Sequence, residues 1–128
     1  MDNMDNLKTI QKREKLNTVR TCGEKGNGGA YHTYEIVGEV VTAERLESNL
    51  SIFVQFQNGP RNLSSSTPGV LDVDLLEIAR HRLQCFQEGD LKTRENAIAL
   101  THIEEALLWM NKRVEDRIER GVLGTNKK

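Results

Sequence analysis

The chain has 128 residues and a mass of 14.5 kDa, which predicts one domain. Its 18 basic and 19 acidic side chains give a net charge of −1, whereas a binder of long nucleic acid usually carries a basic excess. No run of about 18 apolar residues is present, so the sequence predicts no membrane-spanning helix. The first residues are acidic and polar, unlike a secretory signal.

The two cysteines, Cys22 and Cys85, lie far apart in the sequence and lack the local spacing of a zinc site or a disulfide framework. Structural disulfides belong to oxidising compartments. We therefore expect a reduced, cytoplasmic protein.

The N-terminal part is predicted to be rich in β-structure. Residues 6–16 are highly charged and only weakly amphipathic, which indicates either a short helix or a loose arm. Thr18–Cys22 alternates and is rich in β-branched residues, as strands are. Tyr31–Val41 and Leu50–Gln57 are the second and third predicted strands. Between them, Ala43–Asn49 is either a turn of helix or a hairpin loop.

A glycine-dense segment, Gly23–Gly29, separates the first two predicted strands. Its backbone N–H groups could cradle a phosphate, but the lysine-Ser/Thr ending of a P-loop is missing and no helix is predicted to follow. Turn chemistry favours a hairpin connection instead. Residues 58–60 end the third strand, and residues 64–69 are typical of a linker.

After Pro68 the hydrophobic period changes from two to 3.6 residues. Asp72 or Asp74 is expected to be the N-cap of a first helix, which Gly89 ends. One face of this helix carries apolar residues at helical spacing: Leu75, Leu76, Ala79, Leu83 and Phe86.

A second helix is expected from about Lys92 to a C-cap at Gly121, a length of about 43 Å. Its near-heptad stripe consists of Ala97, Leu100, Ile103 or Glu104, Leu107, Met110, Val114 and Ile118. A short connection makes the two helices an antiparallel hairpin. One small chain cannot cover so long a stripe, so we expect a homo-oligomer. The predicted fold class is α+β, with a small antiparallel sheet in residues 1–69 and the helical hairpin in residues 70–128.

No catalytic constellation is evident, and we expect no catalytic residue, no metal and no cofactor. His102 and Glu104 form an H-x-E triplet, but no P-C-x-x-C follows to complete a zinc-deaminase signature. We expect His81 to be solvated. Cys85, beside Phe86, is expected to be a small core residue.

Four residues suit a small, anionic, aromatic ligand. Phe86 lies near the hairpin bend, and Asn96 lies close to the positive end of the second helix dipole. Arg113 and Arg117 are one turn apart, and a guanidinium matches phosphate oxygens and stacks on bases. Acidic residues at 115, 116 and 119 leave open the alternative that both arginines form only surface ion pairs.

Four sequence runs resemble a phage family: the Thoeris anti-defence signal sponges of the first type. These runs are ARHRLQCFQ at 79–87, RENA at 94–97, IEEALLW at 103–109 and RGVLGT at 120–125. The hairpin is also similar to that of the phage anti-CBASS cyclic-nucleotide sponge. The matching part covers about half of the chain.

The resemblance implies a binder without catalytic activity. Family members hold glycocyclic ADP-ribose, made by Thoeris TIR proteins, in pockets between protomers. By matching position, Phe86 would stack on the adenine and Asn96 would hydrogen-bond the ligand. Arg113 and Arg61 would contact the diphosphate or the riboses, although Arg61 lies outside the matching half. Arg117, one turn from Arg113, completes the expected site.

Some members are hexamers with a separate site for CBASS cyclic di- or trinucleotides, for which Thr93 and Arg94 at the bend are our candidates. The expected partners are therefore small cyclic nucleotide signals and other copies of the chain, as a dimer or hexamer, in the cytoplasm of an infected bacterium. Two other classes stay open: an adaptor that docks a host protein through the hairpin, and a phosphodiesterase that destroys the signal.

Overall fold

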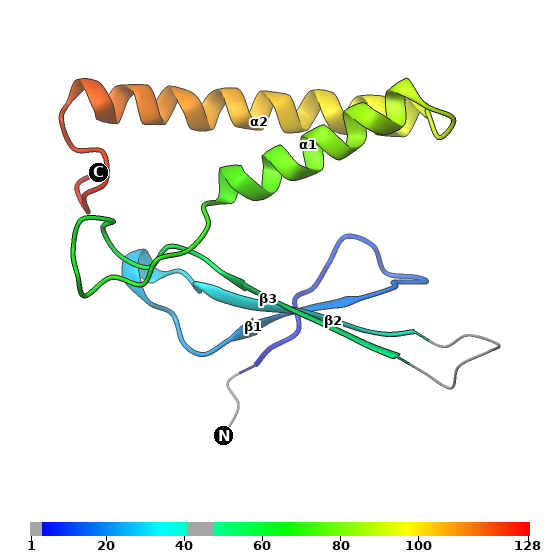
Figure 1. The fold of residues 1–128 in the computed structure, drawn as a ribbon, viewed down its shortest axis with the longest axis horizontal. Helices are drawn as coiled ribbons and strands as arrows, with labels where there is room; N and C mark the ends of the chain where they lie inside the picture. Colours follow the sequence, from blue (N-terminus) through cyan, green and yellow to red (C-terminus); the bar gives the residue numbers. More distant parts are fainter. Residues whose placement is uncertain (1–3, 41–47) are drawn as a thin grey trace. The chain divides into compact units, whose positions relative to one another are not determined.

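The computed structural model describes residues 4–40 and 48–128 (Figure 1). The chain divides into a unit of residues 1–59 and 63–69 and a unit of residues 60–62 and 70–128. The first holds a three-stranded antiparallel sheet and the second holds two long helices, so the predicted α+β class is confirmed. Neither helix is long and apolar enough to cross a membrane.

The sheet has the strand order β1-β2-β3, with both neighbouring pairs antiparallel. β1 spans Thr18–Cys22, as predicted from its alternation. β2 spans Thr33–Val40 and β3 spans Ser48–Gln55, so both predicted strands form with shifted ends. The expected connection over Ala43–Asn49 falls largely outside the described residues.

The charged segment 6–16 was predicted to be either a short helix or a loose arm. The structure shows the arm and no helix there. The beginning of the arm pairs with the edge of β1, because Leu7 N–H donates to Val19 and Thr21 N–H donates to Asp5, both at 2.9 Å. The rest of the arm supplies no continuous apolar face, and Ile10 is fully exposed. Because most helices in proteins are stabilised by packing an apolar face, a weakly amphipathic helix would not be stable here.

The glycine-dense segment is a hairpin connection between β1 and β2, as predicted. It contains a short 3-10 turn, Asn27–Gly29, in which Gly28 and Gly29 have positive φ angles of 73° and 80°. The Gly26 N–H donates to Ala30 and the Gly29 N–H donates to Gly26. Because these N–H groups bond within the loop, the loop closes a turn rather than presenting them to a phosphate.

One polar cluster links all three strands. The carboxylate of Glu35 on β2, which is 5% exposed, accepts hydrogen bonds from Arg20 on β1 at 2.6 and 2.9 Å and from Ser51 on β3 at 2.5 Å. These bonds, first from Ser51 and then from Arg20, hold the pKa of Glu35 below its usual range. The cluster therefore favours the ionised form of the Glu35 carboxyl group.

Helix α1 spans Asp72–Glu88, and Leu71, not Asp72 or Asp74, is its N-cap. Leu71 is extended, and its N–H donates to the Asp74 carboxylate at 2.8 Å. The prediction of an aspartate cap was wrong, because Asp74 satisfies a backbone donor from inside the first turn. The helix ends at Gly89 as predicted.

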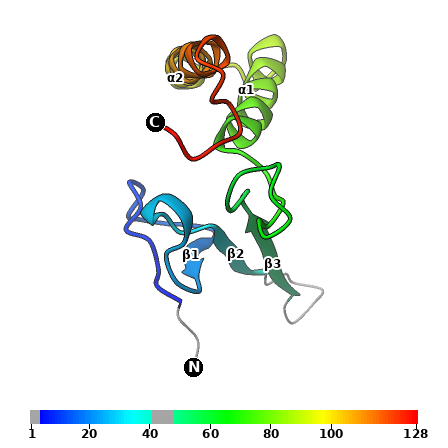
Figure 2. The ribbon, with the colours of Figure 1, turned by 90° about the vertical axis from the view of Figure 1, so that its left-hand side faces the viewer.

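Helix α2 spans Arg94–Glu119, a length of about 39 Å, and begins later than expected because Thr93 is its N-cap. Its C-cap is Arg120, one residue before the predicted Gly121, which follows the helix with a φ of 68°. The Gly121 N–H donates to Ile118, and the N–H of Val122 donates to Arg117, each at 3.0 Å. This is a Schellman ending, in which glycine adopts the left-handed conformation easily. Figure 2 shows the two helices beside one another.

The predicted helix faces are only partly covered. Leu100, Leu107, Met110 and Val114 on α2 are half-buried, but Ile118 is exposed. Cys85 on α1 is exposed, so its assignment to the core was wrong; the ring of Phe86 next to it is the half-buried group. Within the described residues no apolar side chain is fully buried.

Candidate functional site

The hairpin bend is locked by the side chain of Gln87. Its Nε2 donates to the Thr93 carbonyl, and its Oε1 accepts from the Thr93 N–H, both at 3.1 Å. The Thr93 hydroxyl oxygen in turn accepts the Asn96 N–H at 3.0 Å, as an N-cap does. Gln87 was not anticipated from the sequence, since a side chain that bonds only to main chain leaves no periodic signal.

Phe86 and Asn96 are brought to the same end of the hairpin. Phe86 is half-buried in the last turn of α1, and Asn96 is half-buried in the first turn of α2. The guanidinium of Arg82 lies over the Phe86 ring, 5.0 Å from its centroid. Thr93 and Arg94 lie at the same bend, and the Arg94 side chain is exposed. The bend therefore offers an aromatic ring, an amide and cations within two helical turns.

Arg113 is exposed on α2 and, within the described ranges, has no carboxylate within ion-pair distance. The nearby Asp116 pairs instead with Arg120 at 3.0 Å. The alternative of a surface ion pair therefore receives no support at Arg113. Its guanidinium fork is open to an anion.

Arg117 has a different environment, with only 4% of its surface exposed. Its guanidinium donates to the main-chain carbonyls of Val122 at 2.9 Å, Thr125 at 3.0 Å and Lys127. From their spacing, Arg113 and Arg117 were predicted to reach the same surface patch. The structure places the Arg117 guanidinium under the C-terminal tail instead, where it holds the tail against the end of α2.

The predicted ligand residues do not all meet within one chain. Asn96 and Arg113 lie on one continuous helix, about 25 Å apart along its axis. A small nucleotide cannot span that distance. Arg61 lies in the short segment 60–62, which groups with the helical unit, and its side chain is exposed. One hairpin therefore supplies two separate parts of the expected site.

A groove of about 640 Å³ lies between α1 and α2, away from the bend. Arg80 crosses it, bonding to Glu104 at 2.9 Å and to Glu77 at 3.3 Å. These bonds, that of Glu104 first, raise the pKa of Arg80. Asp74 adds a third carboxylate to the lining. The three carboxylates outnumber the single positive charge of Arg80, so this groove is unfavourable for a phosphate.

No cluster of three or more His, Cys, Asp or Glu side chains suited to a metal ion occurs in the described part of the chain. His81 is exposed, as expected. His102 pairs with Glu105 at 3.4 Å rather than with its H-x-E partner.

A three-stranded sheet that leads into a long antiparallel helical hairpin defines the class of this protein. The family model described as "Acb2/Tad1, hairpin domain" matches residues 48–115, more than half of the sequence, and the chain belongs to this family. The matched range begins at β3 and includes Arg61, Phe86, Asn96 and Arg113, but it ends before Arg117.

The chain is similar to "Thoeris anti-defense 1" of Bacillus phage SBSphiJ7, with 38% identity over 106 residues. The aligned region covers 83% of this chain and 66% of that relative, slightly less than two thirds of its length. The resemblance drawn from the sequence runs is thereby confirmed.

Proposed function

We propose that this chain is a phage anti-defence protein that binds a nucleotide immune signal and sequesters it intact. The main ligand is glycocyclic ADP-ribose made by Thoeris TIR proteins, with CBASS cyclic di- or trinucleotides as ligands of a second site at Thr93 and Arg94. Family membership and the name of the phage relative support the anti-defence role. The choice of glycocyclic ADP-ribose follows what the resemblance to the sponge family implies, and the exposed side chains suit an anionic aromatic ligand of this kind.

The observation that carries the proposal is the exposed guanidinium of Arg113, which has no ion-pair partner among residues 4–40 and 48–128. A diphosphate that leaves water must replace its hydration with charged donors, and one hydrogen bond to a charged group is worth about 1.5–3 kcal/mol. Arginine supplies two parallel donors in one plane. Arg113 is therefore the proposed diphosphate contact, and Arg61 is the proposed second cation.

The bend supplies the part of the site that recognises the base. The half-buried Phe86 ring offers a stacking surface, and base–aromatic stacking is worth about 1–3 kcal/mol. Within the described residues the side-chain amide of Asn96 has no hydrogen-bond partner, because only its backbone takes part in the Thr93 cap. The amide is therefore available to the polar edge of a nucleotide.

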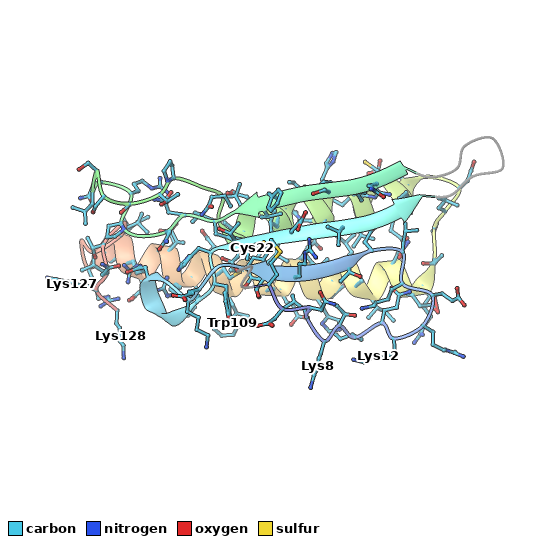
Figure 3. All side chains as sticks on the ribbon, turned by 90° about the horizontal axis from the view of Figure 1, so that it is seen from below. Lys8, Lys12, Cys22, Trp109, Lys127 and Lys128 are labelled. Atoms are coloured by element: carbon cyan, nitrogen blue, oxygen red, sulfur yellow. The ribbon has the colours of Figure 1, made fainter. Side chains whose placement is uncertain are left out.

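Two protomers are needed to complete the site. Since Asn96 and Arg113 are about 25 Å apart on one helix, the bend of one hairpin must meet the Arg113 region of another. Leu108 and Trp109, which are 70% and 68% exposed on α2, supply apolar surface for that association. Figure 3 labels Trp109. We propose a homo-oligomer, dimer or hexamer, with ligand pockets between protomers.

The direct experiment is to titrate the purified protein with glycocyclic ADP-ribose, cyclic trinucleotide and cyclic dinucleotide, and to follow both heat and native mass. The complex is then boiled and the released nucleotide is analysed. Binding with recovery of unchanged nucleotide is the expected result. Recovery of a cleaved nucleotide would instead identify a phosphodiesterase.

The exposed apolar pair Leu108 and Trp109 also favours a second candidate, an adaptor that docks a host protein through the hairpin. The adaptor predicts no heat with any cyclic nucleotide. It also predicts that Arg113 variants behave like the unmodified protein.

A further inference from the structure

Arg82 differs in its contacts from Arg80, the other arginine of α1. It lies one turn before Phe86, with its guanidinium carbon 5.0 Å from the ring centroid. Its side chain is exposed and has no ion-pair partner among the described residues. Arg80, by contrast, is bound to Glu77 and Glu104 and ties α1 to α2. The fold thus uses Arg80 as a structural link and leaves Arg82 on the aromatic ring alone.

We propose that Arg82 is a further ligand-binding residue, whose guanidinium and the Phe86 ring form a clamp that holds a nucleobase between two flat surfaces. This inference rests on the proposed function, in which Phe86 stacks on the adenine. Without ligand the clamp is closed, and the guanidinium covers the ring face. Because Arg82 is exposed and has no carboxylate partner in the described part of the chain, its side chain is free to rotate outward and admit a base.

The relative strengths of the contacts favour opening. An exposed cation–π contact contributes a factor of about two to five to an equilibrium. Stacking of a base on an aromatic side chain contributes a factor of about five to 150. A base therefore displaces the guanidinium from the ring. The planar guanidinium then stacks on the far side of the base, as an ammonium group cannot.

The clamp also explains why the side chain at position 82 is an arginine, whose guanidinium is both charged and planar. A nucleotide ligand carries an aromatic base and an anionic diphosphate, and Arg82 is attractive to both. A ligand with phosphate but no base would gain only the long-range charge. The clamp thus selects for nucleotides over simple phosphate esters.

The test measures affinity for glycocyclic ADP-ribose by calorimetry in four forms: the unmodified protein, Arg82→Ala, Arg82→Lys and Lys92→Ala. Lys92 is an exposed cation near the same bend, so its variant removes the same charge without touching Phe86. We expect Arg82→Ala to bind about tenfold more weakly. Arg82→Lys, which keeps the charge but loses the plane, should recover only part of that loss, and Lys92→Ala should change affinity less than twofold.

A double-mutant cycle with Phe86→Leu measures the coupling between the two residues in ligand affinity. A general effect of removing one positive charge would not produce such coupling. Because both residues hold one base, the loss in the double variant should be smaller than the product of the two single losses. The Arg82→Ala effect should also persist at high salt, since stacking is not screened. Unchanged circular dichroism and oligomer mass confirm the fold of each variant, and Arg82→Lys serves if Arg82→Ala does not fold.

Three results would overturn the clamp while leaving the proposed function intact. One is Arg82→Ala binding within twofold of the unmodified protein while Phe86→Leu binds weakly. Another is an equal loss in Lys92→Ala, and the third is fully multiplicative losses in the cycle. Absence of binding by the unmodified protein would instead refute the proposed function itself, and the clamp with it.

Discussion

Arg113 and Arg117 lie one helical turn apart on α2, yet their guanidinium groups have opposite environments. That of Arg113 is exposed and has no carboxylate partner in the described residues, whereas that of Arg117 is buried beneath the main-chain carbonyls of the C-terminal tail. The same residue type thus serves two tasks. Arg113 is available to a ligand, and Arg117 determines where the chain runs after the helix.

Replacing Arg117 by alanine should release the tail. The substitution removes hydrogen bonds to Val122, Thr125 and Lys127, and we expect a loss of at least about 1.5 kcal/mol, the contribution of one charge-assisted bond. The measurement is amide hydrogen exchange. The Thr125 N–H, bonded to Val122 at 3.1 Å, should lose its protection.

Arg120→Ala is the control for this experiment. Arg120 forms an exposed ion pair with Asp116, of a kind worth about 0.3–0.5 kcal/mol. Its loss should leave the exchange of Thr125 unchanged. Equal exchange in the two variants would contradict the role assigned to Arg117.

Thr93→Ala should destabilise the hairpin by about 1 kcal/mol, because the substitution removes the acceptor of the Asn96 N–H at the start of α2. Thr101→Ala is the matched control, since the Thr101 hydroxyl bonds only back to the Ala97 carbonyl within the helix. Urea unfolding at one fixed protein concentration compares the two variants. If Thr101→Ala were the more destabilised, Thr93 would not be acting as the cap.

The sheet unit should lose stability in acid through Glu35. Hydrogen bonds from Ser51 and Arg20 place the folded-state pKa of Glu35 below its ordinary value of 4.5. The stabilisation is therefore complete above the unfolded-state pKa and is lost as the pH falls through the folded-state pKa. Between pH 7 and pH 3, the urea midpoint of the unmodified protein should fall more than that of Glu35→Gln. Parallel curves would show that Glu35 is not the titrating group.

Trp109→Glu should weaken association between protomers. Trp109 is 68% exposed in the single chain, and burying the rest of such a side chain is worth about 3 kcal/mol. Light scattering at micromolar concentration should show a lower mass for this variant. Ile10→Glu, which places the same charge on a fully exposed residue of the arm, should keep the mass of the unmodified protein. A 14.5 kDa monomer for the unmodified protein would contradict the proposed assembly.

Local sequence signals predicted most of the secondary structure. The β-branched alternation of Thr18–Cys22 predicted β1 correctly, and Gly89 predicted the end of α1. The predicted C-cap of the second helix was displaced by one residue, because Arg120 is the C-cap and Gly121 follows it. The aspartate N-cap was wrong, because several residues in one turn can satisfy the same donors. Cys85 was misplaced since a neighbour of a half-buried ring points in another direction on a helix.

The candidate site was less accessible to sequence reasoning. The locking of the bend by Gln87 and the burial of Arg117 under the tail depend on side chains that bond to main-chain groups beyond the end of their own helix. Such bonds follow no hydrophobic period and require no particular neighbour. The separation of Asn96 and Arg113 already follows from the predicted second helix, and the continuous helix α2 confirms it.

The most direct test of the account is the affinity of Arg113→Ala for glycocyclic ADP-ribose, measured by calorimetry on protein of unchanged oligomer mass. Loss of one partner from a desolvated charge pair costs about 2–5 kcal/mol, so the account predicts binding at least about thirtyfold weaker. Lys112→Ala, which removes an exposed cation next to Arg113 on α2, should bind as the unmodified protein does. If the affinity of Arg113→Ala fell less than about fivefold, the free guanidinium would not be the diphosphate contact, and the central claim would be contradicted.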